Sequence, residues 1–190
     1  QLVHVPYGMV SINGAKLATR TGNVVLLKDL FKAAIEEVSA IMNEKNPNLE
    51  NKEEVAQAVG VGAIVFHYLS NGRIKDINFI MEDALSFDGN TGPYAQYTYA
   101  RACSIMEKAG IPGEMSAYEM NDAELALTKT LATFPEVVRL ALASYEPSEI
   151  TRYILDLCAA FNRFYHECQI VTCEDAAVRS ARIALTGAVR

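Results

Sequence analysis

Ser86–Arg101, reading SFDGNTGPYAQYTYAR, joins a glycine-rich loop to the start of a helix. Pro93 suits a first helical position because the N–H that proline lacks would be unpaired there. Thr91 or Gly92 can cap the helix. The stretch therefore predicts a loop followed by a helix that begins at Pro93.

Two faces separate along this predicted helix. Small and apolar side chains at three- and four-residue steps predict a buried face made of Ala95, Tyr99, Ala102, Met106 and Ala109. Rings and cations share another side, made of Tyr94, Tyr97, Thr98, Arg101 and Lys108. Aromatic rings beside cations at a helix start suit a stacked base and a phosphate. Packing of the tyrosines between helices is the alternative that spacing alone leaves open.

Composition limits the class of protein. The 190 residues are enough for one domain or two small ones, and 51% of them are hydrophobic. The net charge of −6 is shared equally between residues 1–94 and 95–190, so any contact with nucleic acid has to be local. The four cysteines lack the spacing of a zinc site, and no apolar run is long enough to span a membrane. We therefore expect reduced thiols, no bound metal and a cytoplasmic protein.

The pattern along the chain predicts a mainly α fold. Residues 2–12 indicate short strands around a turn, and Asn13-Gly14 is typical of a hairpin. Helices are predicted from Val24 to Asn43 and from Lys52 to Leu69, and a short strand from Arg73 to Ile80. From Tyr94 onward the pattern indicates an all-helical bundle. Gln1 is not a natural start and Arg190 stops within a helical pattern, so we expect a piece of a longer protein.

Helix signals continue through the bundle. Asn121 and Glu124 have the spacing of a capping box, and Pro135 and Pro147 each suit the start of a further helix. The longest apolar run is expected to be buried: Ile150, Ile154, Leu157, Cys158, Phe161, Tyr165 and Cys168.

The end of the chain adds a last helix and several cations. Thr172, with Asp175 three residues on, is expected to cap the final helix. Four arginines fall mostly off the apolar faces and suit either phosphate contacts or a solvated surface: Arg152, Arg163, Arg179 and Arg182.

The segment from Ala15 to Asn23 is a polar loop with two cations. Lys16 and Arg20 can lie over a polyphosphate while backbone N–H groups and Thr19 or Thr21 donate hydrogen bonds. The order of residues is not that of a Walker loop. A solvated surface loop is the alternative.

Taken in order, these segments resemble arginyl-tRNA synthetases, a family of class I aminoacyl-tRNA synthetases. The resemblance rests on YGMVSINGAKLATRTGNVVLLKDL, VGVGAIVFHYLSNGRIKDINF and LSFDGNTGPYAQYTYARACSI, and on the later YILDLCAAFNRFYHEC and ARIALTGAVR. It implies that residues 1–93 end a catalytic domain and that residues 94–190 form an anticodon-binding helical bundle, truncated at its C-terminus. The glycines of the loop before Pro93 would then allow the chain to turn between these two domains.

The resemblance also implies roles for particular residues. Lys16-Leu17-Ala18-Thr19-Arg20 stands where the family has its Lys-Met-Ser-Lys-Ser-type loop, so Lys16 is expected to act on the ATP phosphates, with Thr19 and Arg20 supporting it. Leu17 and Ala18 depart from that pattern, and Ala18 removes a hydroxyl. The tRNA-binding candidates are Tyr94, Gln96, Tyr97 and Arg101.

For the intact protein, the resemblance implies arginine, ATP with Mg²⁺ and tRNA(Arg) as substrates, and no DNA or membrane partner. The histidines His4, His67 and His166 stand in no His-x-Gly-His motif, so the isolated chain is expected to be inactive and to hold no cofactor. The alternatives are a standalone helical RNA-binding module derived from a synthetase and a helical protein-interaction domain.

Overall fold

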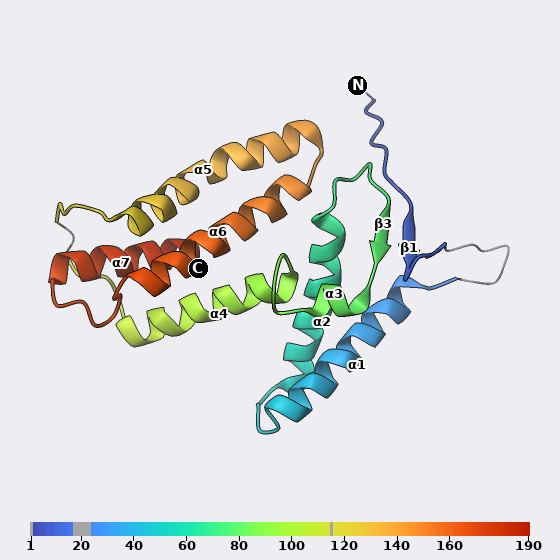
Figure 1. Cartoon of the computed structure of the whole chain (residues 1–190), viewed down its shortest axis with the longest axis horizontal. Helices are drawn as coiled ribbons and strands as arrows, with labels where there is room; N and C mark the ends of the chain where they lie inside the picture. The colour runs from blue at the N-terminus through green and yellow to red at the C-terminus, as the bar shows by residue number, and fades with distance from the viewer. Residues whose placement is uncertain (1, 17–23, 115) are drawn as a thin grey trace. The chain divides into compact units, whose positions relative to one another are not determined.

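A computed structural model describes residues 2–16, 24–114 and 116–190 (Figure 1). It contains two compact units, which we call the first unit and the bundle. The first unit is made of Gln1–Tyr94 and Ser144–Thr151, and the bundle of Ala95–Ala143 and Arg152–Arg190. The mainly α fold class is confirmed, with a small sheet near the N-terminus and helices after it.

The first unit combines a small sheet with helices. Its elements are β1 (Val10–Ile12), β2 (Ala15–Lys16), α1 (Leu27–Lys45), α2 (Lys52–Leu69), β3 (Ile77–Phe79) and α3 (Met81–Leu85). The sheet has the order β2-β1-β3, with β1 antiparallel to β2 and parallel to β3. The predicted bounds of α2 are confirmed. Helix α1 begins at Leu27 instead of the predicted Val24, since Leu26 has an extended backbone.

Helices α1 and α2 pack closely because one position lacks a side chain. A Cβ on Gly60 would lie 3.0 Å from the backbone nitrogen of Ile35 and 3.1 Å from the carbonyl carbon of Ala34. The buried side of α2 is made of Ala56, Gly60, Ala63 and Ile64. Val55, on the same helix, lies outside this buried side and is 37% exposed.

Helix α4 (Gly92–Ala109) starts against α2. Thr91 caps it, since its hydroxyl accepts a hydrogen bond from the N–H of Tyr94 at 3.2 Å, as the sequence predicts. A Cβ on Gly92 would lie 3.0 Å from Cβ of Phe66 and 3.1 Å from Cα of Ala63, so glycine allows the close approach.

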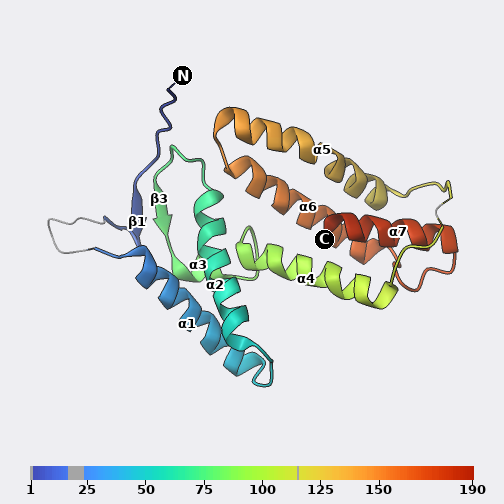
Figure 2. The same ribbon diagram turned by 180° about the vertical axis from the view of Figure 1, so that it is seen from behind.

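The bundle is formed by α4 together with α5 (Asp122–Ser144), α6 (Ser148–Glu167) and α7 (Ala176–Val189). Both ribbon views show these helices side by side (Figure 1 and Figure 2). Their shared core contains Ala102, Ile105, Ala123, Leu127, Phe161, Phe164, Cys168, Ile170 and Ile183. The Asn121–Glu124 capping box is confirmed, with 2.8 Å and 2.9 Å between its N–H donors and carboxylate and amide oxygens.

Two predicted helix boundaries are wrong. Pro135 lies inside α5 instead of starting a helix. The N–H that it lacks would bond to the Leu131 carbonyl, yet packing against α6 continues, with the Phe134 and Tyr153 rings 5.2 Å apart. Helix α7 is capped by Asp175 and not by Thr172. The Asp175 carboxylate accepts hydrogen bonds from the N–H groups of Ala177 at 2.9 Å and Val178 at 3.1 Å.

The buried face of α4 also differs from the prediction. Thr98, Ala102 and Ile105 are buried, whereas Tyr99 is 52% exposed. Small and aromatic side chains occur all round this helix, so spacing alone could not identify the face that α6 covers.

Candidate functional site

The β1–β2 hairpin leads directly into the predicted phosphate-binding loop. Asn13 and Gly14 have φ values of 49° and 75°, the left-handed conformation that an Asn-Gly hairpin turn requires. Ser11 pairs with Lys16 in the ladder, which confirms the predicted hairpin and places Lys16 at the end of β2. The other two phosphate-binding candidates, Thr19 and Arg20, lie outside the described residues.

Asn78 on β3 holds this hairpin from the neighbouring strand. Its side-chain oxygen accepts hydrogen bonds from the N–H of Gly14 at 2.7 Å and from the hydroxyl of Ser11 at 3.2 Å. Asn78 belongs to no motif in the sequence. Asparagine has a low propensity for β-strands. Its presence within the predicted strand was therefore the signal that could have indicated a hydrogen-bonding role for this side chain.

Arg101 on α4 lies between two tyrosine rings. Its guanidinium carbon is 4.8 Å from the centre of the Tyr97 ring and 4.8 Å from the centre of the Tyr165 ring. Tyr97 comes from the preceding turn of α4, and Tyr165 comes from α6. Both distances are within the range of cation–π contacts.

Hydrogen bonds fix the orientation of this guanidinium. Nη1 donates to the side-chain oxygen of Asn162 at 2.6 Å, and Nη2 donates to the Tyr97 hydroxyl at 3.0 Å. Asn162 in turn donates to the hydroxyl of the buried Thr98 at 3.3 Å. These acceptors are neutral, so the bonds orient the positive charge without cancelling it. We call Tyr97, Arg101, Asn162 and Tyr165 the ring–cation cluster.

The cluster unites two of the four predicted tRNA-binding residues. Tyr97 is 53% exposed and touches Arg101, whereas Tyr94 and Gln96 are half-buried and take no part in the contacts that define the cluster. Tyr165 was expected to be buried but is 40% exposed. Its partners lie on α4, about sixty residues earlier, so no local pattern marked it.

The four arginines considered for phosphate contacts have different surroundings. Arg182 lies in the bundle interior, where Nε donates to the carboxylate of the buried Glu124 at 2.6 Å and Nη1 donates to the Gln169 carbonyl at 2.8 Å. Arg163 pairs with Glu167 on the surface, and Arg179 donates to the Cys173 carbonyl. Exposed Arg152 also has an interaction within the structure. Arg182 is therefore a structural residue.

Burial shifts the pKa of several titratable groups, among them His67 and Cys158. The pKa of His67 is lowered, chiefly because burial disfavours the charged ring, while the nearby Asp83 carboxylate partly opposes this. Its ring lies 5.2 Å from that of Phe79, in a packing role. Burial also raises the pKa of the Cys158 thiol. Among the described residues, no group of three or more histidine, cysteine or acidic side chains is placed to hold a metal.

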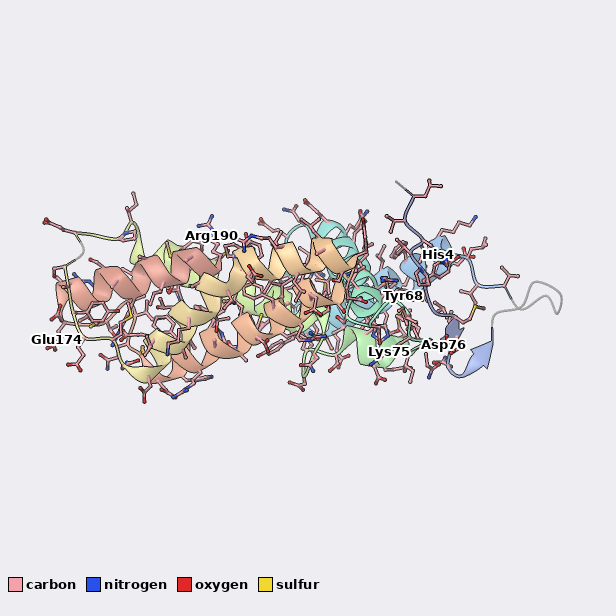
Figure 3. The ribbon with its side chains drawn as sticks, turned by 90° about the horizontal axis from the view of Figure 1, so that it is seen from above. His4, Tyr68, Lys75, Asp76, Glu174 and Arg190 are labelled. Atoms are coloured by element: carbon pink, nitrogen blue, oxygen red, sulfur yellow. The ribbon has the colours of Figure 1, made fainter. Side chains whose placement is uncertain are left out.

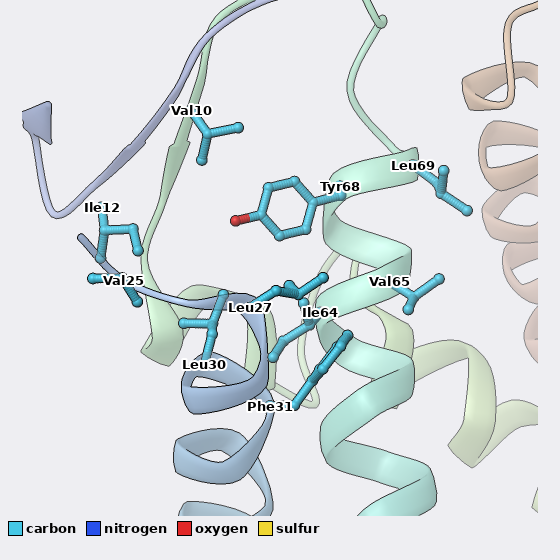
Figure 4. Close-up of a pocket in the computed structure, with 10 residues that line it drawn as sticks. All are labelled: Val10, Ile12, Val25, Leu27, Leu30, Phe31, Ile64, Val65, Tyr68 and Leu69. Atoms are coloured by element: carbon cyan, nitrogen blue, oxygen red, sulfur yellow. The ribbon is translucent and has the colours of Figure 1, made fainter. Parts of the chain in front are cut away.

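An apolar groove opens on the first unit. Figure 4 shows its lining, which comes from β1, α1, α2 and the segment before α1. Leu27 is 57% exposed and Val65 43% exposed, so large apolar side chains face solvent here. The groove, of about 480 Å³, is lined by Val10, Ile12, Val25, Leu27, Leu30, Phe31, Ile64, Val65, Tyr68 and Leu69. Exposed apolar surface of this kind is typical of a contact region.

No helix in the described part of the chain has the length and apolar character needed to cross a bilayer. Two family models match successive segments of the chain. Residues 1–81 match the catalytic domain of class I tRNA synthetases (R), and residues 95–190 match the DALR anticodon binding domain.

Relatives cover both segments at once. An arginine–tRNA ligase of Alkaliphilus metalliredigens is 47% identical over 98% of this chain, and one of Clostridium botulinum is 46% identical over 96%. In each case the chain spans 33% of the relative's length. The arginyl-tRNA synthetase of Thermus thermophilus superposes on 96% of the chain with a TM-score of 0.87 and 33% identity. That of Plasmodium falciparum, at 24% identity and a TM-score of 0.80, shares the fold.

Proposed function

Since the chain belongs to the arginyl-tRNA synthetase family, as its C-terminal part, we propose that it works within an enzyme that activates arginine with ATP and transfers it to tRNA(Arg). In this proposal residues 1–93 complete the catalytic domain and residues 94–190 bind the anticodon region of the tRNA. The enzyme acts in the cytoplasm and uses ATP with Mg²⁺.

The ring–cation cluster carries the RNA-binding part of the proposal. It lies within the segment that matches an anticodon-binding domain, and it presents exposed rings beside a cation. An unpaired base can stack on Tyr97 or Tyr165, and Arg101 supplies positive charge for the adjoining phosphate. Tyr94 and Gln96 remain candidates beside it, with the Gln96 amide suited to a base edge.

Titration of tRNA(Arg) against the intact synthetase tests this site. Tyr97→Ala is expected to weaken binding by about 1–3 kcal/mol, the value of one stacked base. Tyr99→Ala is the matched control, because Tyr99 is an equally exposed tyrosine of α4 outside the cluster, with 52% against 53% exposure. Equal affinity of Tyr97→Ala and wild type would remove the cluster from the tRNA site.

For the catalytic step, we propose that Lys16 stabilises the charge that builds on the ATP phosphates as the arginine carboxylate attacks the α-phosphorus and pyrophosphate leaves. Thr19 and Arg20 assist it as further donors. Such a contact acts mainly on the transition state. Lys16→Ala in the intact enzyme should lower the rate of arginine activation by roughly 10²–10³. An unchanged activation rate would refute the assignment.

We further propose that the apolar groove of the first unit is covered by the remainder of the catalytic domain. The chain spans about a third of its relatives' length, and the groove belongs to the segment that matches a catalytic domain. By itself the chain should then have no arginine-dependent activity. Arginylation of tRNA by the purified 190-residue chain would refute this part of the proposal.

A further inference from the structure

A pocket opens in the bundle between the last turn of α4 and the start of α7. Its volume of about 540 Å³ is within the range of small-molecule sites. Its lining comes from the end of α4, residues 111–114, Val171 and the first half of α7, all of which belong to the bundle. Figure 3 labels Glu174, which stands two residues before α7 at this end of the bundle. The pocket therefore belongs to one unit and shares no residue with the ring–cation cluster.

Ser180 lies at the floor of this pocket. It is 6% exposed, and its hydroxyl forms no hydrogen bond with the residues that the structure describes. A Cβ added to Gly113 would lie 3.0 Å from Oγ of Ser180, so this oxygen points toward the segment that forms the opposite wall. Ile183, about one turn further along α7, is 4% exposed and adds apolar surface to the floor. A buried hydroxyl ordinarily has a hydrogen-bond partner, and a ligand in the pocket would supply one.

Two exposed cations stand at the rim, Lys108 on α4 and Arg179 on α7. Lys108 forms no ion pair within the described part of the chain. Arg179 uses one guanidinium nitrogen for the Cys173 carbonyl, at 3.3 Å, and has further N–H donors. The only acidic residue of the lining is Glu114, so the lining has a net charge of +1 in a chain whose net charge is −6. The pocket thus favours an anionic ligand.

The start of α7 is not itself the source of this preference. The Asp175 carboxylate already accepts hydrogen bonds from two N–H groups of the first turn. An anion in the pocket would therefore be held by the two cationic side chains and not by the helix N-terminus.

The lining matches the separate parts of a nucleotide. Lys108 and Arg179 suit the phosphate. Ile111 and Val171, which are 93% and 37% exposed, offer apolar surface to the face of a base. The Glu114 carboxylate can only accept hydrogen bonds, and the exocyclic amino group of cytosine or adenine donates them. Inorganic phosphate alone would leave the apolar surface and Glu114 without a counterpart.

We propose that this pocket binds a nucleotide, with the phosphate on Lys108 and Arg179 and an amino-bearing base against Ile111 and Glu114. The Ser180 hydroxyl is a further hydrogen-bonding group at the floor. The site is separate from the ring–cation cluster, because Lys108 follows Arg101 by seven residues, about 10 Å along α4. A free nucleotide and a nucleotide of the tRNA strand present the same groups, and the two arms of the experiment distinguish them. The tRNA arm rests on the proposed function, whereas the free-nucleotide arm does not.

The first arm measures the Kd of CMP for the intact synthetase by NMR titration. CMP avoids competition at a site that binds ATP, and UMP is the matched probe because it has a carbonyl in place of the amino group. Lys108→Ala and Arg179→Ala should each weaken CMP binding by about tenfold, as expected for a hydrogen bond to a charged group. Glu114→Gln should remove the preference for CMP over UMP, since an amide both donates and accepts.

The second arm measures tRNA(Arg) binding to the same variants over a range of salt concentrations. If the nucleotide belongs to the tRNA, Lys108→Ala should reduce the slope of log K against log salt by about 0.7, the contribution of one phosphate contact in a single strand. Lys129→Ala, at an exposed lysine of α5, is the control and should leave both the slope and CMP binding unchanged.

A reduced slope for Lys108→Ala would support the inference with tRNA as the source of the nucleotide. Weaker CMP binding with an unchanged slope would support it with a free nucleotide as the ligand. Wild-type binding of both CMP and tRNA by Lys108→Ala and Arg179→Ala would overturn it, and so would binding of inorganic phosphate as tight as that of CMP. Failure of the wild-type enzyme to bind tRNA(Arg) would instead refute the proposed function, and the CMP arm would still decide on the pocket.

Discussion

The two units treat their interiors differently. In the bundle, the buried carboxylate of Glu124 accepts hydrogen bonds from the Arg182 guanidinium and from the N–H of Asn121. In the first unit, by contrast, an apolar groove is open, and large apolar side chains such as Leu27 and Val65 face solvent. The bundle thus holds a charged pair in its interior, whereas the first unit leaves apolar surface exposed.

Glu124→Gln should cause the largest loss in the free energy of unfolding, and it should act on the bundle. It leaves the mostly buried charge of Arg182 without its carboxylate partner, and loss of one member of a buried pair costs about 3–5 kcal/mol. Denaturant unfolding with hydrogen exchange should show the loss in α5, α6 and α7, and much less of it in α1 and α2. Equal loss of protection in both units would show that they unfold as one.

Gly8→Ala should disturb the first unit by a steric effect. An added Cβ would lie 2.1 Å from the carbonyl oxygen of Lys75, so the segment before β1 has to move away from β3. Overpacking of this kind costs about 1–3 kcal/mol. Gly72→Ala is the control, since the nearest atom to its added Cβ, Cδ of Lys75, is 3.9 Å away. A Gly8→Ala chain as stable as Gly72→Ala would contradict the close contact.

Acid should weaken the first unit more than the bundle. Because the pKa of His67 is lowered in the fold, the unfolded chain binds more protons below the ordinary histidine pKa of about 6.5. The stabilisation is complete above that pH and is lost as the pH falls through the lowered pKa. His67→Phe, which keeps an aromatic ring near Phe79 but cannot titrate, should reduce the slope of stability against pH.

The exposed His166→Gln is the control for that measurement and should leave the slope unchanged. Hydrogen exchange in α2 at several pH values between neutral and mildly acidic resolves the effect locally. The same slope in wild type and His67→Phe would show that other groups cause the acid sensitivity.

Glu36→Gln should have the smallest effect. Its carboxylate lies 3.7 Å from the Lys32 ammonium, and the two side chains are 66% and 76% exposed. Exposed pairs at this helical spacing contribute about 0.3–0.5 kcal/mol, and salt screens them. Compared with Glu124→Gln, the same chemical change should therefore differ severalfold in unfolding free energy. A similar loss in both variants would mean that burial does not distinguish the two carboxylates.

Much of the secondary structure was predictable because its signals are local. The apolar pattern from Lys52 to Leu69 predicted the bounds of α2, and the Asn121–Glu124 spacing marked the start of α5. The prediction failed at Pro135, where proline removes one hydrogen bond but neighbouring packing keeps the helix continuous. It also failed at Tyr99 and Tyr165, since a face rich in rings does not show which side another helix covers.

The candidate site was only partly predictable for the same reason. Tyr97 and Arg101 are one helical turn apart, so their proximity follows from the period of α4. Tyr165 and Asn162 join them from α6, at a separation of 61 residues between Arg101 and Asn162. That separation leaves no trace in local periodicity.

The sequence by itself determined which segments form helices, the Asn13-Gly14 hairpin and the resemblance to one family, because turn conformations and helix caps depend on residues close together in the chain. Only the tertiary structure decided which arginine pairs with a buried carboxylate, which lies between two rings and which joins distant segments. Arg182, Arg101 and Arg73 have the same side chain, and their roles differ because the packing of helices and strands gives each guanidinium different partners: a carboxylate, two rings and three backbone carbonyls.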